Sequence, residues 1–211
     1  MVWVLCGDGQ KHVSGWYLFL MTKNRLENFS DAVIAIILTI MVLELQIPHT
    51  TAWGSVLELY PLFIAYGLSF AFIGIYWVNH HHLIHAVGAV NSKILWANML
   101  LLFCLSLIPW ATGFMGENHF EQNSVIVYTL LCILPAITYA LLSTAIIRSK
   151  NPNAQALRIL QKTKSKEYMS LALYVLALAS SFWNTAISLS LIFIVSCIWI
   201  IPNKQIEEIF D

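Results

Sequence analysis

The sequence predicts an all-α membrane protein built from six transmembrane helices. Three features lead to this fold class: the composition, the lengths of the apolar runs and the distribution of basic residues. Of 211 residues, 59% are hydrophobic and only 10% are charged, and the mean hydropathy is +0.73. Soluble domains carry about a quarter charged residues, and a membrane-spanning helix needs about 20 mostly apolar residues. The long uncharged runs therefore indicate membrane spans.

Six apolar runs fit such helices. Asn28 is placed to cap the first, and Pro48 ends it. Gly67 and Gly74 in the second run would permit close contact between helices. Asn184 marks a tight turn between the last two runs. The expected spans cover residues 29–47, 57–79, 93–112, 123–147, 168–183 and 185–201.

Residues 1–22 fit neither a span nor a cleaved signal. The apolar patch 13–21 is too short to cross a bilayer and lacks a small-residue cleavage site. It carries a tryptophan and a tyrosine, which favour a membrane interface. We expect an N-terminal extension that lies at the interface or precedes a native start at Met21. A transmembrane domain over residues 23–202 and a cytoplasmic tail over 203–211 would follow.

The basic residues all fall on one side of the membrane if the six spans alternate in direction. The opposite loops hold acids instead, among them Glu58, Glu117 and Glu121. Lysine and arginine accumulate on the cytoplasmic side of membrane proteins, so we expect a multi-pass protein of the cell (inner) membrane with both termini in the cytoplasm. The basic stretch 148–167 is expected to be a solvated loop or to touch anionic lipid headgroups. The eleven basic residues are Lys11, Lys23, Arg25, Lys93, Arg148, Lys150, Arg158, Lys162, Lys164, Lys166 and Lys204.

A polar motif opens the first span, where charged groups are costly and usually mark function. Arg25, Ser30 and Asp31 lie at the mouth of this helix. Arg25 and Asp31 are six residues apart, roughly 240° around a helix, so each would reach a different neighbour. A plain helix start with a basic anchor is the alternative interpretation. The candidate partners at the same end are Trp77, His81 and His82 of the second span and Lys93 and Asn98 of the third.

Beyond this motif, an apolar stripe follows one face of the first span. Ile36, Thr39 or Ile40, Leu43 and Ile47 recur at intervals of three or four residues, which is a helical period. By the helical rise, Ile36 lies ~7–8 Å past the motif aspartate, and Thr39 lies ~4–5 Å deeper. We interpret the stripe as the lining of an ion pore. Its hydrophobic collar would gate by dewetting and favour K⁺, which sheds water at lower cost than Na⁺. Ordinary packing or lipid contact is the alternative.

Other kinds of chemistry have weak support in the sequence. His81 and His85 have a spacing suitable for zinc if the helix continues. No carboxylate pair or cysteine accompanies them, so we expect polar contacts at a helix end and no metal site. The four cysteines have no framework spacing. The sequence contains no GxSxG, P-loop, HExxH or GxGxxG motif, and no TVGYG-like filter or arginine-rich voltage sensor. We therefore expect no enzyme, no cofactor and no nucleic-acid partner.

The motif Arg25-x-x-x-Phe29-Ser30-Asp31, followed by Ala-x-x-Ala-Ile36-x-x-Thr39, resembles the signature of the transmembrane protein 175 family. Members of this family are potassium channels of bacteria and endolysosomes that lack the standard filter. The resemblance covers residues 25–112, and the later helices agree in length and topology. Its further elements are Ser69-Phe70, Trp77, His81-His82, Asn98 and Leu107-Ile108-Pro109-x-x-Thr112.

The resemblance implies a homotetramer of six-helix subunits, in which the first helix of each subunit lines a central pore. It places the apolar constriction at Ile36, the pore-facing hydroxyl at Thr39 and a further apolar ring at Leu43. Bacterial members also pass other monovalent cations, so strict K⁺ selectivity is not implied. The resemblance further implies a network of hydrogen bonds between helices, formed by Arg25, Phe29, Ser30, Asp31, Trp77, His81 and Asn98.

We therefore expect a passive, K⁺-permeable, homotetrameric channel in the lipid bilayer. Three other functions remain open. A proton-linked secondary transporter would use Asp31 and the histidines as a relay, and it needs ionisable groups near the middle of the membrane. A membrane metalloenzyme would use the cluster His80–His85. A non-conducting structural membrane protein is the third.

Overall fold

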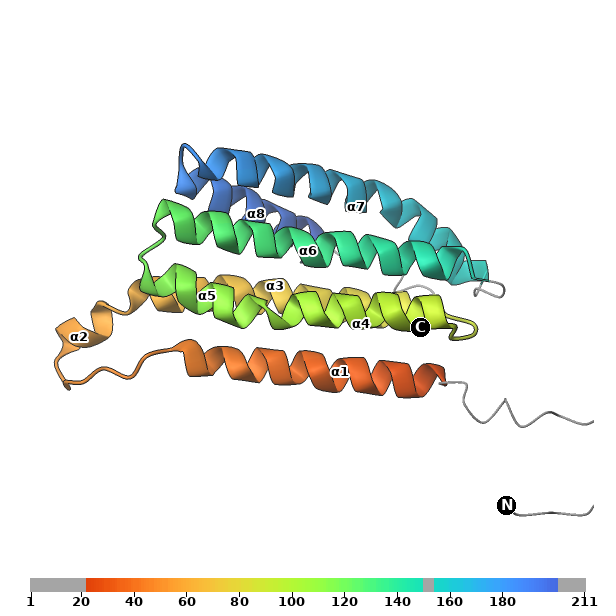
Figure 1. Cartoon of the computed structure of the whole chain (residues 1–211), viewed down its shortest axis with the longest axis horizontal. Helices are drawn as coiled ribbons and strands as arrows, with labels where there is room; N and C mark the ends of the chain where they lie inside the picture. Colours follow the sequence, from red (N-terminus) through yellow and green to blue (C-terminus); the bar gives the residue numbers. More distant parts are fainter. Residues whose placement is uncertain (1–21, 150–153, 201–211) are drawn as a thin grey trace, which may run out of the picture.

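A computed structural model describes residues 22–149 and 154–200, and every regular element in these two ranges is a helix. The expected all-α class is therefore confirmed for this part of the chain. The long helices lie side by side along one axis (Figure 1). The elements are α1 Lys23–Ile40, the 3₁₀ helix η2 Met41–Glu44, α2 Trp53–Leu57, α3 Tyr60–His85, α4 Ser92–Ser106, α5 Ile108–Glu117, α6 Gln122–Ile147, α7 Ala154–Ser181 and α8 Thr185–Ile200.

The bundle has α1 at one edge and α7 at the other (Figure 1). α1 packs against α3 and α4, whereas α6 packs against α4 and α7. Because the long helices alternate in direction, the start of α1, the end of α3, the start of α4 and the end of α6 share one end of the molecule. We call this the basic end, because Lys23, Lys93 and Arg148 lie there. Glu117 and Glu121 lie at the opposite end, where α5 meets α6.

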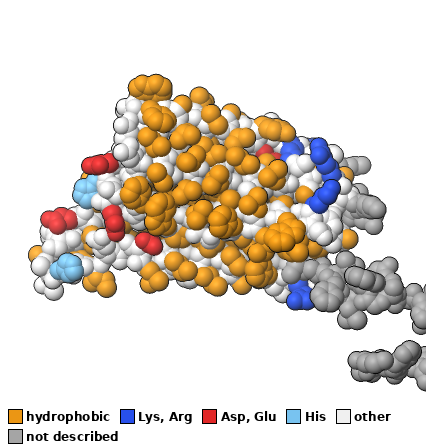
Figure 2. Space-filling view, in the orientation of Figure 1, with side chains coloured by type: hydrophobic (Ala, Val, Ile, Leu, Met, Phe, Trp, Pro, Cys, Tyr) orange, Lys and Arg blue, Asp and Glu red, His pale blue; other side chains and the backbone are white. Residues whose placement is uncertain are grey.

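An apolar belt separates these two ends. Figure 2 shows blue basic side chains at one end, most of the visible red acidic side chains and pale-blue histidines at the other, and a broad orange surface between them. Large exposed apolar side chains occur on most of the long helices, among them Phe103 on α4 and Leu141 on α6. Such an extended apolar surface indicates contact with lipid or with another protein.

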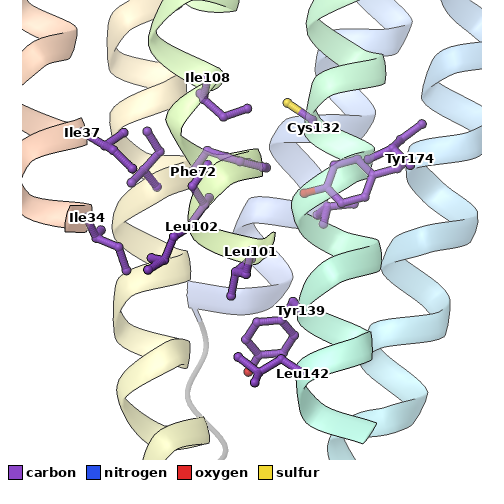
Figure 3. Packing of buried hydrophobic residues seen from close by; sticks show 14 of the residues in the cluster. Ile34, Ile37, Phe72, Leu101, Leu102, Ile108, Cys132, Tyr139, Leu142 and Tyr174 are labelled. Carbon is purple, nitrogen blue, oxygen red and sulfur yellow. The ribbon is translucent and has the colours of Figure 1, made fainter. Parts of the chain in front are cut away.

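Buried side chains fill the space between the helices. Figure 3 shows Phe72 of α3, Leu101 of α4, and Tyr139 of α6 among these buried residues. Tyr174 brings α7 into the same cluster, because its ring meets that of Phe72 edge to face, with 6.5 Å between centroids. The core is therefore continuous from α3 to α7, and α1 adds one face to it.

The first helix begins earlier than expected. α1 starts at Lys23, and the Thr22 hydroxyl accepts a hydrogen bond from the backbone N–H of Arg25 at 3.4 Å. Thr22 is therefore the N-cap, and the prediction that Asn28 caps this helix is wrong. The sequence offers two polar cap residues, and the earlier one is used. The α-helix ends at Ile40, and a 3₁₀ turn continues it to Glu44.

Two further helix boundaries differ from the expected ones. α3 continues six residues past the expected end at Asn79, because a run of histidines is compatible with a helix. The expected third span is divided into α4 and α5. Pro109 lies in the first turn of α5, where its missing N–H has no helical partner to lose.

The expected loop over residues 148–167 is mostly helix, so that prediction is wrong. α7 begins at Ala154 and reaches Ser181. Lys164 is partly buried, and its Nζ donates to Glu167 Oε2 at 2.7 Å and to Thr144 Oγ1 on α6 at 3.0 Å. Lysine and glutamate are good helix formers, and hydropathy therefore underestimates the length of this helix.

Four stretches have the length and apolar composition of a membrane span: Lys23–Glu44, Trp53–His85, Ser92–Glu117 and Gln122–Ile147. α8 is apolar but has only 16 residues. By length and composition alone, the described helices therefore include four candidate spans. The expected extension 1–22, apart from Thr22, and the expected tail 203–211 lie outside the described residues.

Candidate functional site

The first helix has two different faces. Its buried face contains Leu26, Ser30, Ile34 and Ile37, and Met41 continues this face into η2. These positions recur every three or four residues, as expected for one side of a helix, and they pack against α3 and α4. Within the described part of the chain, α1 is thus anchored to the bundle along one side.

The opposite face of α1 is an exposed apolar stripe, formed by Ile36, Thr39, Ile40, Leu43 and Ile47. The exposed fraction is 55% for Ile36, 78% for Leu43 and 85% for Ile47. Leu43 lies in the 3₁₀ helix and Ile47 beyond it, so the regular helical spacing of the stripe ends at Ile40. The stripe contains no charged side chain and meets no other part of the described chain closely enough to be buried.

Thr39 supplies the only hydroxyl of this stripe. Its Oγ1 donates a hydrogen bond to the carbonyl oxygen of Ile36 at 2.8 Å. The proton is therefore directed at the helix backbone, and the lone pairs of the exposed oxygen remain able to accept a proton or coordinate a cation. Thr39 therefore places an oxygen acceptor on the same exposed face of α1 as the Ile36 side chain.

A buried polar chain joins three helices behind this stripe. Asn98 on α4 lies at its centre: its Nδ2 donates to Ser30 Oγ on α1 at 2.9 Å, and its Oδ1 lies 2.7 Å from His80 Nε2 on α3. Ser30 in turn donates to the backbone carbonyl of Leu26 at 2.8 Å. Ser30, His80 and Asn98 are all fully buried. Buried polar groups are costly unless paired, so this chain fixes the relative positions of α1, α3 and α4.

Two more contacts tie α1 to α3 nearer the surface. The Trp77 indole donates to Asp31 Oδ1 at 3.1 Å. His81 Nδ1 lies 3.2 Å from Glu27 Oε1, and His85 Nε2 lies 3.8 Å from the same oxygen. All these residues lie in the half of each helix that approaches the basic end.

The structure does not join every residue of the expected network. The Arg25 side chain is exposed and makes no hydrogen bond or ion pair with the described residues, and Phe29 is also exposed. His81 contacts Glu27 instead of the motif serine or aspartate. Arg25 and Phe29 therefore belong to the exposed surface of this chain.

Two residues of this network were not identified from the sequence, His80 and Glu27. His80 lies in the histidine run, but only the rotation of α3 decides which histidine faces Asn98. Glu27 lies inside the motif, and a helix that starts at Lys23 places it one turn before Asp31. Recognition of Thr22 as the cap could have revealed Glu27 as a helical residue.

A second buried cluster involves the resemblance residues Ser69 and Thr112. Thr112 Oγ1 on α5 donates to Ser69 Oγ on α3 at 2.7 Å, and Ser69 Oγ lies 2.9 Å from the Tyr128 hydroxyl on α6. All three side chains are buried. This cluster joins α3, α5 and α6, and it supports the helices against which α1 packs.

Comparison with known proteins gives concordant results. The sequence model of the family described as endosomal/lysosomal potassium channel TMEM175 matches residues 25–109. A potassium channel of Chryseobacterium sp. (strain P1-3) is 48% identical over 188 residues, which are 89% of this chain and 97% of that protein.

More distant relatives extend the comparison. The crystal structure of a lysosomal potassium-selective channel TMEM175 homolog from Chamaesiphon minutus superposes with a TM-score of 0.76 at 26% identity, covering 84% of this chain and 96% of that chain. The endosomal/lysosomal proton channel TMEM175 of Gallus gallus is 26% identical over 79% of this chain, but the match spans only 37% of the chicken protein. The motif on α1, the matched fold and the near full-length similarity to the Chryseobacterium channel together show that this chain belongs to the TMEM175 potassium channel family.

Proposed function

We propose that four copies of this chain form a passive, potassium-permeable channel in the cell membrane, with α1 of each copy lining the pore. The observation that carries this proposal is the exposed apolar stripe on α1, opposite the face that packs on α3 and α4. The potassium-channel names of the Chryseobacterium and Chamaesiphon relatives support the choice of ion.

The described residues of a single chain form no pore of their own, because α1 lies at the edge of the bundle (Figure 1). Four copies around an axis would bring four α1 stripes together and leave the lipid-facing helices outside. Such a ring closes through head-to-tail interfaces. It would also cover the exposed apolar side chains Ile36 and Leu43, which a single copy leaves open.

Within this pore, Ile36 forms the constriction, Thr39 provides a ring of hydroxyl oxygens and Leu43 forms a second apolar ring. An apolar ring at the narrowest point opposes the entry of hydrated ions and so contributes both a gate and a preference for weakly hydrated cations. The Thr39 oxygens would compensate a dehydrated ion directly beyond the constriction.

The polar contacts between helices would hold α1 in register around this pore. Ser30 and Asp31 attach α1 to Asn98 and Trp77 in the described chain. Arg25, Phe29 and His81 complete the set at the basic end. Because Arg25 and Phe29 are exposed in a single copy, their partners in this proposal are the neighbouring subunits or lipid.

We place both termini in the cytoplasm and count six spans, adding α7 and α8 to the four candidate spans. α7 packs along α6 and α8 packs along α7, so both follow the same axis as the four. The collection of lysine and arginine at one end of an apolar belt (Figure 2) supports this orientation. No cofactor is needed for passive conduction.

Flux into liposomes that contain the purified protein tests the proposal. K⁺ and Na⁺ uptake would be measured for the wild type and for Ile36→Asn, which places an amide at the constriction. We expect passive, K⁺-favouring uptake in the wild type and a raised share of Na⁺ in the variant. Ile137→Asn on α6 is a matched control, since Ile137 is also exposed, at 40%, but lies away from α1. An unchanged ion ratio in Ile36→Asn, or an equal change in Ile137→Asn, would refute the pore assignment.

The same assay addresses the proton-linked alternative, which the proton-channel names of vertebrate relatives raise again. Between Asp31 and Glu44, the first helix and its extension contain no titratable side chain. A pore lined by this stretch has no proton relay of its own. We expect K⁺ uptake without an imposed proton gradient, and a strict requirement for such a gradient would favour a transporter.

A further inference from the structure

We propose that Glu27, His81 and His85 form a binding site for a divalent transition metal of the zinc class, at the basic end of the bundle. The site joins α1 to α3. Each residue offers one ligand atom, and these three atoms all lie within 4.8 Å of one another. The inference goes beyond the proposed channel and does not depend on it.

The geometry of the three groups fits a common centre. In a tetrahedral zinc site with bonds of about 2.0–2.2 Å, neighbouring ligand atoms are roughly 3.3–3.6 Å apart. Here His81 Nδ1 lies 3.2 Å and His85 Nε2 lies 3.8 Å from Glu27 Oε1. The two imidazole rings approach each other with 4.5 Å between centroids, at an angle of 69°. Small rotations of side chains at the bundle surface would complete three corners of a tetrahedron.

The helices make this convergence possible. α3 continues through His85, so His81 and His85 lie one turn apart on the same face of one helix. Glu27 approaches from α1, where the helix starts early enough to include it. The sequence suggested no metal site because no carboxylate accompanies the histidines along the chain. The fold supplies that carboxylate from a helix more than fifty residues away in sequence.

The donor set selects the class of metal. Two imidazoles and one carboxylate suit zinc and its first-row neighbours, whereas Mg²⁺ and Ca²⁺ prefer all-oxygen ligands. His81 is about half exposed, with 49% of its side chain accessible, and Glu27 is 17% accessible. Solvent can therefore reach the centre and fill the fourth position, as in zinc sites with three protein ligands.

One nearby group opposes the metal. Lys23 Nζ donates a hydrogen bond to the backbone carbonyl of His85 at 3.1 Å, so a positive charge lies close to the site. Removal of this charge should strengthen metal binding if the metal occupies the proposed position. Lys23→Met keeps the length of the side chain and removes the charge, which makes it an informative variant.

The competing explanation is an ion pair without metal, in which a protonated histidine contacts Glu27. Both imidazoles approach the same carboxylate oxygen, although one protonated ring would satisfy an ion pair. A metal ion bound by all three groups would hold both ring nitrogens at about these distances from the carboxylate oxygen. Metal binding measured directly distinguishes the two explanations.

The experiment uses the full chain, purified in detergent without a histidine tag and treated with a chelator. Equilibrium dialysis against Zn²⁺, with the metal content measured by mass spectrometry, should give one zinc per chain for the wild type. Glu27→Gln, His81→Ala and His85→Ala should each weaken binding by more than about tenfold, which is the smallest loss expected even for changes outside the ligand shell. His49→Ala, at an exposed histidine beyond the other end of α1, should bind like the wild type, and Lys23→Met should bind more tightly.

Two additional measurements keep the test decisive if a variant folds poorly. His85→Cys retains a zinc ligand and should restore binding that His85→Ala loses. Zinc should also raise the unfolding temperature of the wild type, since a ligand of the folded state stabilises it, and should leave that of Glu27→Gln unchanged. Absence of zinc from the wild type, or equal binding in all variants, would overturn the site in favour of an ion pair.

Discussion

The side-chain amide of Asn98 on α4 donates a hydrogen bond to the hydroxyl of Ser30 on α1, with 2.9 Å between Nδ2 and Oγ. The carbonyl oxygen of the same amide lies 2.7 Å from His80 Nε2 on α3. One side chain therefore satisfies polar groups of two other helices at a fully buried position. The position of α1, which carries the exposed stripe, depends on this amide.

Asn98→Leu should destabilise the chain although it adds apolar volume. The variant leaves His80 Nε2 without its partner, and His80 Nδ1 has no hydrogen-bond partner among the described residues. An unsatisfied buried polar group costs about 1–3 kcal/mol. Thermal unfolding in detergent, followed by tryptophan fluorescence, should show a clearly lower midpoint. Asn24→Leu, at an exposed position of α1, is the control, and equal midpoints for both variants would contradict a supporting role for Asn98.

Asp31→Ala should impair assembly rather than conduction. Asp31 accepts a hydrogen bond from the Trp77 indole, and it faces α3 instead of the exposed stripe. Loss of this acceptor loosens the contact between α1 and α3, so we expect less assembled protein by size-exclusion chromatography with light scattering. Trp77→Phe removes the donor and keeps a smaller aromatic ring, and it should act in the same direction. A stable oligomer with altered single-channel conductance would show that Asp31 acts in the pore instead.

Thr39→Ala should reduce the preference for K⁺ over Na⁺. The hydroxyl proton is directed at the Ile36 carbonyl at 2.8 Å, which leaves the oxygen as the coordinating atom. A contact of this kind is worth about 0.5–1.5 kcal/mol net, which corresponds to a roughly twofold to tenfold change in the ratio. Thr39→Ser keeps the hydroxyl and should retain the preference. Reversal potentials in mixed K⁺ and Na⁺ solutions provide the measurement, and an unaltered ratio in Thr39→Ala would remove Thr39 from the pore.

Much of the fold could be predicted from the sequence, because apolar runs and polar loops alternate clearly. α6 runs over Gln122–Ile147, one residue longer than the expected span, and α8 closely matches its expectation as well. Asn184 forms the expected tight turn, where its Oδ1 accepts hydrogen bonds from the N–H groups of Ala186 and Ile187. Each of these features depends on residues that are close together in the chain, so it can be predicted from a single sequence.

The remaining features depend on tertiary packing. Hydropathy detects only the apolar half of α7, since the charged half is helical but not apolar. The choice of His80 as the partner of Asn98 depends on how α3 and α4 are rotated against each other. The meeting of Glu27 with His81 depends on the same packing. A rotation of one residue, about 100° around a helix, would present a different histidine, and no local pattern encodes that angle.

Two helices approach each other closely at a glycine other than the two expected. No atom of another described helix lies within 4 Å of a Cβ built on Gly67 or Gly74, so among the described residues these glycines do not mark a close helix contact. A Cβ on Gly116 of α5 would instead lie 2.6 Å from Leu62 Cδ1 and 2.9 Å from Leu62 Cα on α3. The leucine side chain could move, but its backbone atom could not move without separation of the two helices.

Gly116→Ala and Gly67→Ala should therefore change stability in opposite directions. Alanine gains up to about 1 kcal/mol over glycine in a helix interior, and Gly67→Ala should realise this gain because the space is open. At Gly116 the overlap with α3 should outweigh it, since overpacking a fitted contact costs about 1–3 kcal/mol. Thermal unfolding of the two variants in the same detergent gives the comparison. If Gly116→Ala proved as stable as Gly67→Ala, α3 and α5 would have to lie further apart than they do here, and the Ser69–Thr112 hydrogen bond between them would have to be weaker.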